Sequence, residues 1–126
     1  METRVKLSNG LTVVNFSSPH SFVFSTGEVL PGCDAERSKA LMLESVENGE
    51  DSPCGRYENI SLIFVMTTEV KAELDRLNAD PTVDVIIVPL PVMTALKNAG
   101  LAIGKVRVCR SADRISKAIF PDKFCI

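Results

Sequence analysis

Tryptophan is absent from the 126 residues, tyrosine and histidine occur once each, and the longest apolar stretches are short. A stretch such as 85–90 is too short to cross a bilayer, and residues 1–25 do not show the charged-then-apolar pattern of a signal peptide. We therefore expect a soluble, cytoplasmic protein that makes no membrane contact. With 45% hydrophobic and 24% charged residues, residues 1–126 are expected to form a single domain.

The cysteines are not spaced for zinc, because no two of them form a Cys-x-x-Cys pair and His20 is the only histidine. We expect no metal site, and free thiols at Cys33, Cys54, Cys109 and Cys125. Cys33 directly precedes a helical pattern, and a thiol at a helix N-terminus can become reactive. His20 lies in a turn-like stretch without a neighbouring nucleophile.

Phosphate-binding fingerprints are also missing, since neither the Walker pattern nor Gly-x-Gly-x-x-Gly occurs. We assign no catalytic residue and no cofactor, and we favour a binding protein over an enzyme. An enzymatic reading would depend on Asp113, Asp84 or Cys33 as acid, base or nucleophile.

Two hairpins are predicted in the hairpin region, residues 1–32. Ser8-Asn9-Gly10 separates β-rich runs at 4–7 and 11–16, and Asn-Gly is a strong turn signal because both residues tolerate positive φ. A second pair of runs, 22–24 and 28–30, flanks Ser25-Thr26-Gly27.

Residues 33–126 are expected to alternate helices and strands. A helix is predicted over 35–47, with Asp34 as its N-cap and Asn48-Gly49 as its stop, followed by a mobile surface loop at 48–59. The apolar run 60–66 is typical of a strand covered on both faces.

The remaining elements predict strand–helix–strand units: a helix from Thr67 or Thr68 to about 78, then strand 83–88, helix 92–98 and strand 104–110. Residues 111–126 fit either a final helix turn or an edge strand. The succession predicts an α/β or α+β fold whose mixed sheet contains parallel pairs and is extended by the N-terminal hairpins.

Ligands of open α/β sheets collect beyond the carboxyl ends of parallel strands, and three junctions of the predicted sheet qualify. Thr67 and Thr68 can bind a ligand or simply cap their helix. The segment 89–91, Pro-Leu-Pro, shapes a wall or is a rigid connector.

The third junction joins two guanidinium groups, a hydroxyl and a carboxylate directly after a strand: Arg110, Ser111, Asp113 and Arg114. Arginine suits bidentate binding of phosphate or carboxylate. Residues 97–126 hold seven basic and two acidic side chains, whereas residues 28–58 hold eight acidic and three basic ones. Arg107, which alternates with valines, is a weaker candidate because it fits a solvent-facing strand position.

Three segments resemble small uncharacterised proteins encoded by bacteriophages: Leu7-Ser8-Asn9-Gly10-Leu11, Val88-Pro89-Leu90-Pro91-Val92-Met93 and Asp122-Lys123-Phe124-Cys125-Ile126. The resemblance carries no catalytic motif. It implies an accessory protein, located in the host cytoplasm, that binds a host molecule.

The leading hypothesis is therefore a homo-oligomeric protein that binds an anionic small molecule, with nucleotides as one candidate class, near the C-terminal basic segment. The alternative is a protein-interaction module that docks on a host protein, or forms an assembly, through its acidic and basic faces. Nucleic-acid binding is disfavoured, because only Phe120 and Phe124 accompany the basic residues there.

Overall fold

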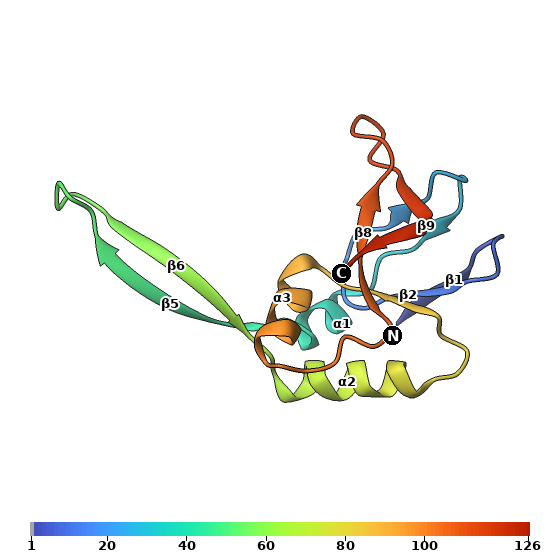
Figure 1. Ribbon diagram of the computed structural model, residues 1–126, viewed down its shortest axis with the longest axis horizontal. Helices are drawn as coiled ribbons and strands as arrows, with labels where there is room; N and C mark the ends of the chain where they lie inside the picture. Colours follow the sequence, from blue (N-terminus) through green and yellow to red (C-terminus); the bar gives the residue numbers. More distant parts are fainter. Residues whose placement is uncertain (1) are drawn as a thin grey trace.

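The computed structural model describes residues 2–126 and has a five-stranded mixed sheet at its centre (Figure 1). Its strand order is β1–β2–β7–β8–β9. The strands are β1 (Thr3–Lys6), β2 (Thr12–Asn15), β7 (Val85–Ile87), β8 (Val106–Ser111) and β9 (Ile119–Cys125). The three central strands pair in parallel and the two edge strands pair antiparallel, as the α+β prediction requires.

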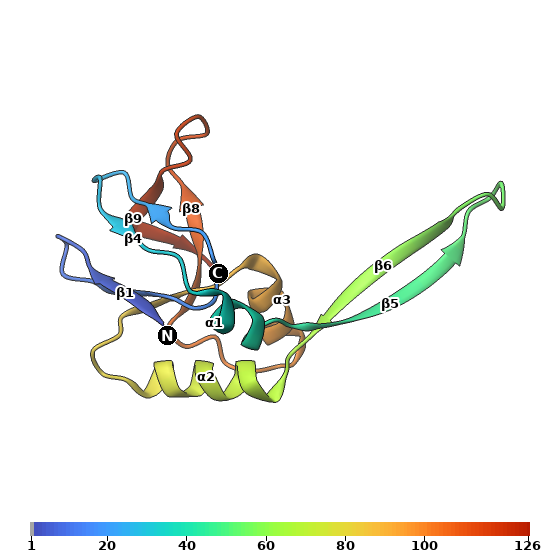
Figure 2. The same cartoon turned by 180° about the vertical axis from the view of Figure 1, so that it is seen from behind.

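Both faces of this sheet are covered. Helices α2 (Thr68–Ala79) and α3 (Leu90–Asn98) lie on one face with the short α1 (Ala35–Ala40), and the small hairpin β3 (Phe22–Val23)–β4 (Val29–Leu30) lies on the other (Figure 2). Successive residues of β7 alternate between the two cores: Ile86 packs with the helices, whereas Val85 and Ile87 pack with β3 and β4. This two-sided burial explains the continuous apolar sequence of the central strands.

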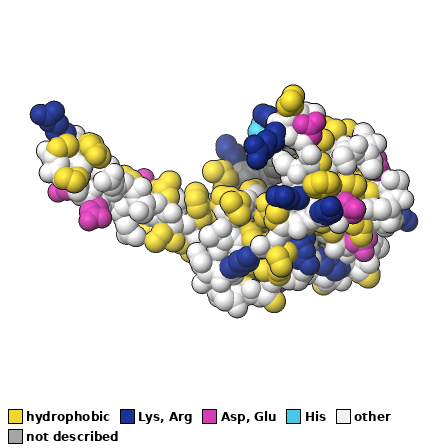
Figure 3. Space-filling model, turned by 45° about the horizontal axis from the view of Figure 1, so that its top comes forward, with side chains coloured by type: hydrophobic (Ala, Val, Ile, Leu, Met, Phe, Trp, Pro, Cys, Tyr) yellow, Lys and Arg dark blue, Asp and Glu magenta, His cyan; other side chains and the backbone are white. Residues whose placement is uncertain are grey.

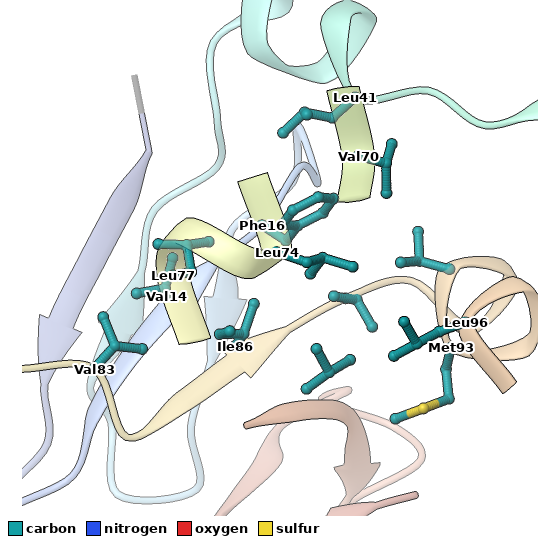
Figure 4. Packing of buried hydrophobic residues seen from close by; sticks show 13 residues of the cluster. Val14, Phe16, Leu41, Val70, Leu74, Leu77, Val83, Ile86, Met93 and Leu96 are labelled. Carbon is teal, nitrogen blue, oxygen red and sulfur yellow. The ribbon is translucent and has the colours of Figure 1, made fainter. Parts of the chain in front are cut away.

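The larger core lies between the sheet and the helices (Figure 4). Val70, Leu74 and Leu77 form the buried stripe of α2, at the three- and four-residue spacing of one helix face. They meet Phe16, which follows β2 and is fully buried. Phe16 therefore fixes the point where the chain leaves the carboxyl end of β2.

Both predicted N-terminal hairpins form, but only the first extends the central sheet, because β3 and β4 make a separate two-stranded sheet. Gly10 has φ 92°, which suits glycine, and the Asn9 side chain accepts a hydrogen bond from the Leu11 amide at 3.1 Å. In the second hairpin Phe22 pairs with Leu30, and Gly27 also has φ 92°.

The predicted helix over 35–47 is wrong beyond residue 40. Asp34 caps the start as expected, accepting a hydrogen bond from the Arg37 amide at 2.8 Å, but Leu41 ends the helix and is buried in the main core. The chain then extends as β5 (Glu44–Asp51), which pairs with β6 (Glu58–Val65) over eight residues. Long-range strand pairing has overridden the local helical pattern here.

The predicted mobile loop at 48–59 is likewise mostly a hairpin. We call β5 and β6 with their connecting turn the arm, residues 44–65; it stands away from the body in both ribbon views (Figures 1 and 2). At its tip Pro53 and Gly55 make a turn in which the Gly55 amide donates to the Ser52 carbonyl at 3.0 Å. Gly55 has φ 72°.

The strand predicted at 60–66 exists, but the expectation that it is covered on both faces is wrong. Every residue of β6 is exposed, and β6 belongs to the arm rather than to the central sheet. The open choice at the C-terminus is resolved in favour of an edge strand, β9, whose edge position tolerates Pro121. None of the helices in residues 2–126 has both the length and the apolar character that crossing a membrane requires.

Candidate functional site

A cavity of about 610 Å³ lies at the carboxyl edge of the parallel strands. It is bounded by the segments that follow β2 and β7, by α1 and by the base of the arm. The lining residues are Ser17, Ser18, Pro19, Ala35, Ser38, Lys39, Leu41, Met42, Leu43, Phe64, Pro89, Pro91 and Val92. Its size, mostly apolar lining and few polar groups are typical of small-molecule sites.

The wall that follows β2 is held by a fully buried asparagine. The Asn15 amide nitrogen donates to the carbonyls of Ser18 and Pro31, both at 3.0 Å, and its oxygen accepts from the Ser18 amide at 2.9 Å. Cys33 adds to this frame, because its amide donates to the Ser18 carbonyl at 2.8 Å. The turn at 17–19 is thus fixed from inside the protein, so its serines keep their position without a ligand.

The α1 wall is anchored by Arg37, whose side chain is only 8% exposed. Its Nε donates to the Phe16 carbonyl at 2.7 Å, and its guanidinium pairs with Glu73 of α2 at 2.5 Å. Burial alone would raise the pKa of Glu73, but hydrogen bonds and charges from Arg76 and Arg37 outweigh burial and lower it. The ionised pair ties α1, and with it Ser38 and Lys39, to the body.

The wall that follows β7 consists of the predicted Pro-Leu-Pro segment. Pro89 is the N-cap of α3 and Pro91 lies in its first turn, and both line the cavity. Because Pro91 has no amide hydrogen, this helix end offers few free donors. The segment therefore shapes the site, as predicted, more than it binds charge.

Thr67 and Thr68 lie elsewhere. The Thr67 hydroxyl accepts a hydrogen bond from the Val70 amide at 3.1 Å and caps α2, and Thr68 is exposed in the first turn. Because this junction follows β6 and not a strand of the central sheet, it is not at the carboxyl edge of the parallel strands. Its structure fits the capping role.

Arg110, Ser111, Asp113 and Arg114 lie in the hairpin that joins β8 to β9. All four are exposed. Asp113 accepts a hydrogen bond from the Ile115 amide at 2.9 Å, and this bond is the main reason that its pKa is lowered. Within residues 2–126 neither arginine side chain has a hydrogen bond or ion pair, so both guanidinium groups are free to bind an anion.

Arg107 differs from these two arginines. Its guanidinium donates to the Gly104 carbonyl at 2.8 Å and to the Val106 carbonyl at 2.7 Å. These bonds hold the side chain on the backbone of its own strand.

The cavity and the basic hairpin both lie beyond the carboxyl ends of parallel strands, but no residue of the hairpin lines the cavity. β8 runs parallel to β7, so Ser111 at the end of β8 points in the same direction as the end of β7 that leads to Pro89. Sequence reasoning identified the hairpin and Pro89–Pro91 but missed Ser17, Ser18, Ser38 and Lys39. The Ser-Ser-Pro turn directly after a predicted strand was the available signal.

The residues considered for catalysis lie apart from one another, and Cys33 and Asp84 make structural hydrogen bonds. Cys33 is buried and its thiol donates to the Asn15 carbonyl at 3.2 Å; Asp84 accepts from the Thr12 amide at 2.8 Å, at the opposite end of β7 from the cavity. His20 is exposed in a turn. In the described part of the chain no group of three histidine, cysteine or acidic side chains is arranged to hold a metal ion.

Comparisons with protein-family models, with curated proteins and with solved structures find no match to this chain.

Proposed function

We propose that this protein binds a small anionic molecule with a sizeable apolar or planar part in the cavity at the carboxyl edge, without turning it over. A nucleotide is the leading candidate class. The observation that carries the proposal is the position and lining of the cavity: it lies where parallel α/β sheets place their ligands, and its walls are mostly apolar.

The apolar and polar groups of the cavity suit the apolar or planar part and the anionic part of such a ligand. Leu41, Val92 and Phe64 offer apolar surface to a ring, and the hydroxyls of the lining serines provide hydrogen bonds. Lys39 supplies a positive charge at the wall. The free arginines of the β8–β9 hairpin, projecting from the same edge, raise the local potential and attract an anion.

The resemblance to phage-encoded proteins supports a role of this kind, in which an accessory protein in the host cytoplasm withdraws a small molecule from use. Such a role requires tight binding and no reaction chemistry. It therefore agrees with a site built from serines, a lysine and apolar walls.

The first test is native mass spectrometry of protein purified from a nucleotide-rich lysate. We expect a mass above that of the denatured chain, and the excess should identify the ligand. A titration with a panel of mono- and dinucleotides, followed by calorimetry, then measures the affinity. No excess mass together with no binding across the panel would refute the proposal.

Two substitutions on α1 test the cavity itself. Ala35→Trp places a large side chain at the wall from an exposed position and should weaken binding by at least about tenfold. Ala40→Trp makes the same change at an exposed position of the same helix that does not line the cavity, and should bind like the unchanged protein. Equal affinity of the two variants would place the ligand elsewhere.

Arg110→Ala and Arg114→Ala test the basic hairpin. Because neither side chain lines the cavity and both are exposed, we expect each change to weaken anion binding through the loss of long-range attraction and to leave the thermal midpoint nearly unchanged. Undiminished binding in both variants would remove the hairpin from the site.

A further inference from the structure

The arm is an incomplete piece of sheet. All sixteen residues of β5 and β6 are exposed, and the two strands pair only with each other. An isolated two-stranded hairpin is marginally stable in water. The sequence of β6 is nevertheless one that strands adopt when both faces are covered, which indicates that something outside the chain covers this strand.

The strand register places apolar side chains on both faces of the arm. Val46 lies opposite Ile63, and Val65 follows on the same face, whereas Ile60, Leu62 and Phe64 of β6 line the other face. These side chains are about half exposed, Leu62 at 53%. Neither face is therefore a solvent face.

Apart from Tyr57 near the tip, the exposed apolar side chains of the arm lie in its inner part and continue onto the body. Met42, just before β5, is 66% exposed and lines the cavity together with Phe64. Figure 3 shows hydrophobic side chains along the arm and where it joins the body. Such a continuous exposed apolar surface marks an interaction site.

The outer part of the arm has an excess of acidic side chains, although Arg56 lies in its turn (Figure 3). Glu50, Asp51 and Glu58 surround its tip, and residues 44–65 contain five acidic side chains and one basic one. Within residues 2–126 none of these carboxylates forms an ion pair. The complementary charge is in the same sequence, because residues 97–126 hold seven basic and two acidic side chains.

We propose that the partner of the arm is a second copy of this chain, related by a two-fold axis. The inner, apolar halves of the two arms pack on each other near their bases. Each acidic tip then reaches the basic β8–β9 hairpin of the other copy. The contact between the outer arm of one copy and the β8–β9 hairpin of the other therefore occurs twice, as two-fold symmetry requires.

The dimensions fit this arrangement. Eight-residue strands extend roughly 26 Å, close to the diameter of a small domain. Because each arm packs through one face, three half-exposed apolar side chains per copy lie in the seam. Contact of the polar outer arm with the β8–β9 hairpin then has to supply the rest of the roughly 800 Å² per partner of a stable interface. The proposal shares Met42 and Phe64 with the cavity described above, but its tests use ligand-free protein, so its outcome is distinguishable from that of the ligand proposal.

Sedimentation velocity of the ligand-free protein across a range of concentrations is the direct test. We expect a species of twice the 13.7 kDa chain mass that dissociates on dilution. A monomer at every concentration would overturn the proposal, and so would species that keep growing with concentration, because they indicate an open array. Raising the salt from about 0.05 to about 0.5 M should weaken the dimer several-fold.

The double variant Leu62→Ser/Ile63→Ser removes one apolar side chain from each face and should raise the dimer dissociation constant by on the order of 100-fold. Ala72→Ser/Ala79→Ser changes two exposed residues of α2, outside the arm, and should leave the constant unchanged. Equal dimerisation of the two variants would overturn the role of the apolar faces.

Hydrogen exchange of the unmodified protein provides a test that does not depend on a variant folding. Amides of residues 44–65 should exchange quickly in dilute solution and become protected as the dimer forms, whereas those of β7 should be protected throughout. A dimer whose arm amides stay unprotected would show that another surface joins the two copies.

Discussion

Replacing Arg37 by methionine tests whether one side chain fixes α1, and with it a wall of the cavity. Methionine keeps much of the apolar stem and volume of arginine. The change removes the hydrogen bond to the Phe16 carbonyl and the ion pair with Glu73, and it ends the contact of the guanidinium with the Phe16 ring, whose centroid lies 5.8 Å away.

The expected loss of stability is about 2 kcal/mol. A hydrogen bond from a charged donor contributes roughly 1.5–3 kcal/mol, and removing one partner of a fully buried ion pair costs about 3–5 kcal/mol. The loss from the Arg37–Glu73 pair is smaller than that of a fully buried pair, because the Glu73 side chain is 16% exposed and keeps its hydrogen bond from Arg76. One guanidinium nitrogen of Arg37 is buried without a partner, and relieving that defect offsets roughly 1 kcal/mol.

Urea unfolding followed by circular dichroism measures this loss as a lower midpoint at unchanged slope. Glu73→Gln alone should cost less, and the double variant should cost less than the sum of the two single variants, because the residues share one interaction. A loss below about 0.5 kcal/mol for Arg37→Met, or strict additivity in the cycle, would refute the reasoning.

Two further predictions concern titration and thiol chemistry. Hydrogen bonds from the Thr82 side chain and amide, with a contribution from Arg4, lower the pKa of Asp80 from 3.8 to about 2. The stability that this lowered pKa contributes is complete above the pKa of the unfolded state and is lost as pH falls from about 4 to about 2. Asp80→Asn should therefore make the free energy of unfolding less dependent on pH in this acid range. An unchanged pH dependence would contradict the prediction. Iodoacetamide should label Cys54 much faster than Cys109, and mass spectrometry of digests can measure the two rates. The reason is that a hydrogen bond from Ser52 lowers the pKa of the exposed Cys54 thiol, whereas burial raises the pKa of Cys109 to about 12. Equal labelling rates would contradict this prediction.

Local sequence predicted most of the elements whose signals are themselves local. Asn9-Gly10, the Asp34 and Thr67 caps and the apolar stripe of α2 depend on neighbours within a few residues, and the structure confirms them. The arm could not be found this way. β5 carries three glutamates, an aspartate and a glycine, so only pairing with β6 makes it a strand.

The site was predictable to the same extent. The rule that ligands collect at the carboxyl edge of parallel strands pointed to the edge where the cavity lies, because strands β2, β7 and β8 have recognisable sequences, but none of the predicted ligand-binding residues lines the cavity. It could not supply Ser38 and Lys39, since the helix that carries them is only six residues long and its position depends on the Arg37–Glu73 contact. That contact joins residues 36 positions apart, beyond the reach of periodicity.

The placement of β2 determines the order in which the chain can fold during synthesis. Val13 pairs with Val85, so the β2–β7 pair joins segments separated by more than half of the chain, whereas β7 and β8 are close in sequence. The N-terminal hairpin is synthesised first, and β2 has no parallel partner until residue 87 has left the ribosome. The arm and α2 are made in this interval, but an isolated hairpin is marginally stable and α2 needs the sheet to bury its apolar stripe, so neither becomes stable by itself. Folding should therefore be slow, limited by closing the long loop between β2 and β7.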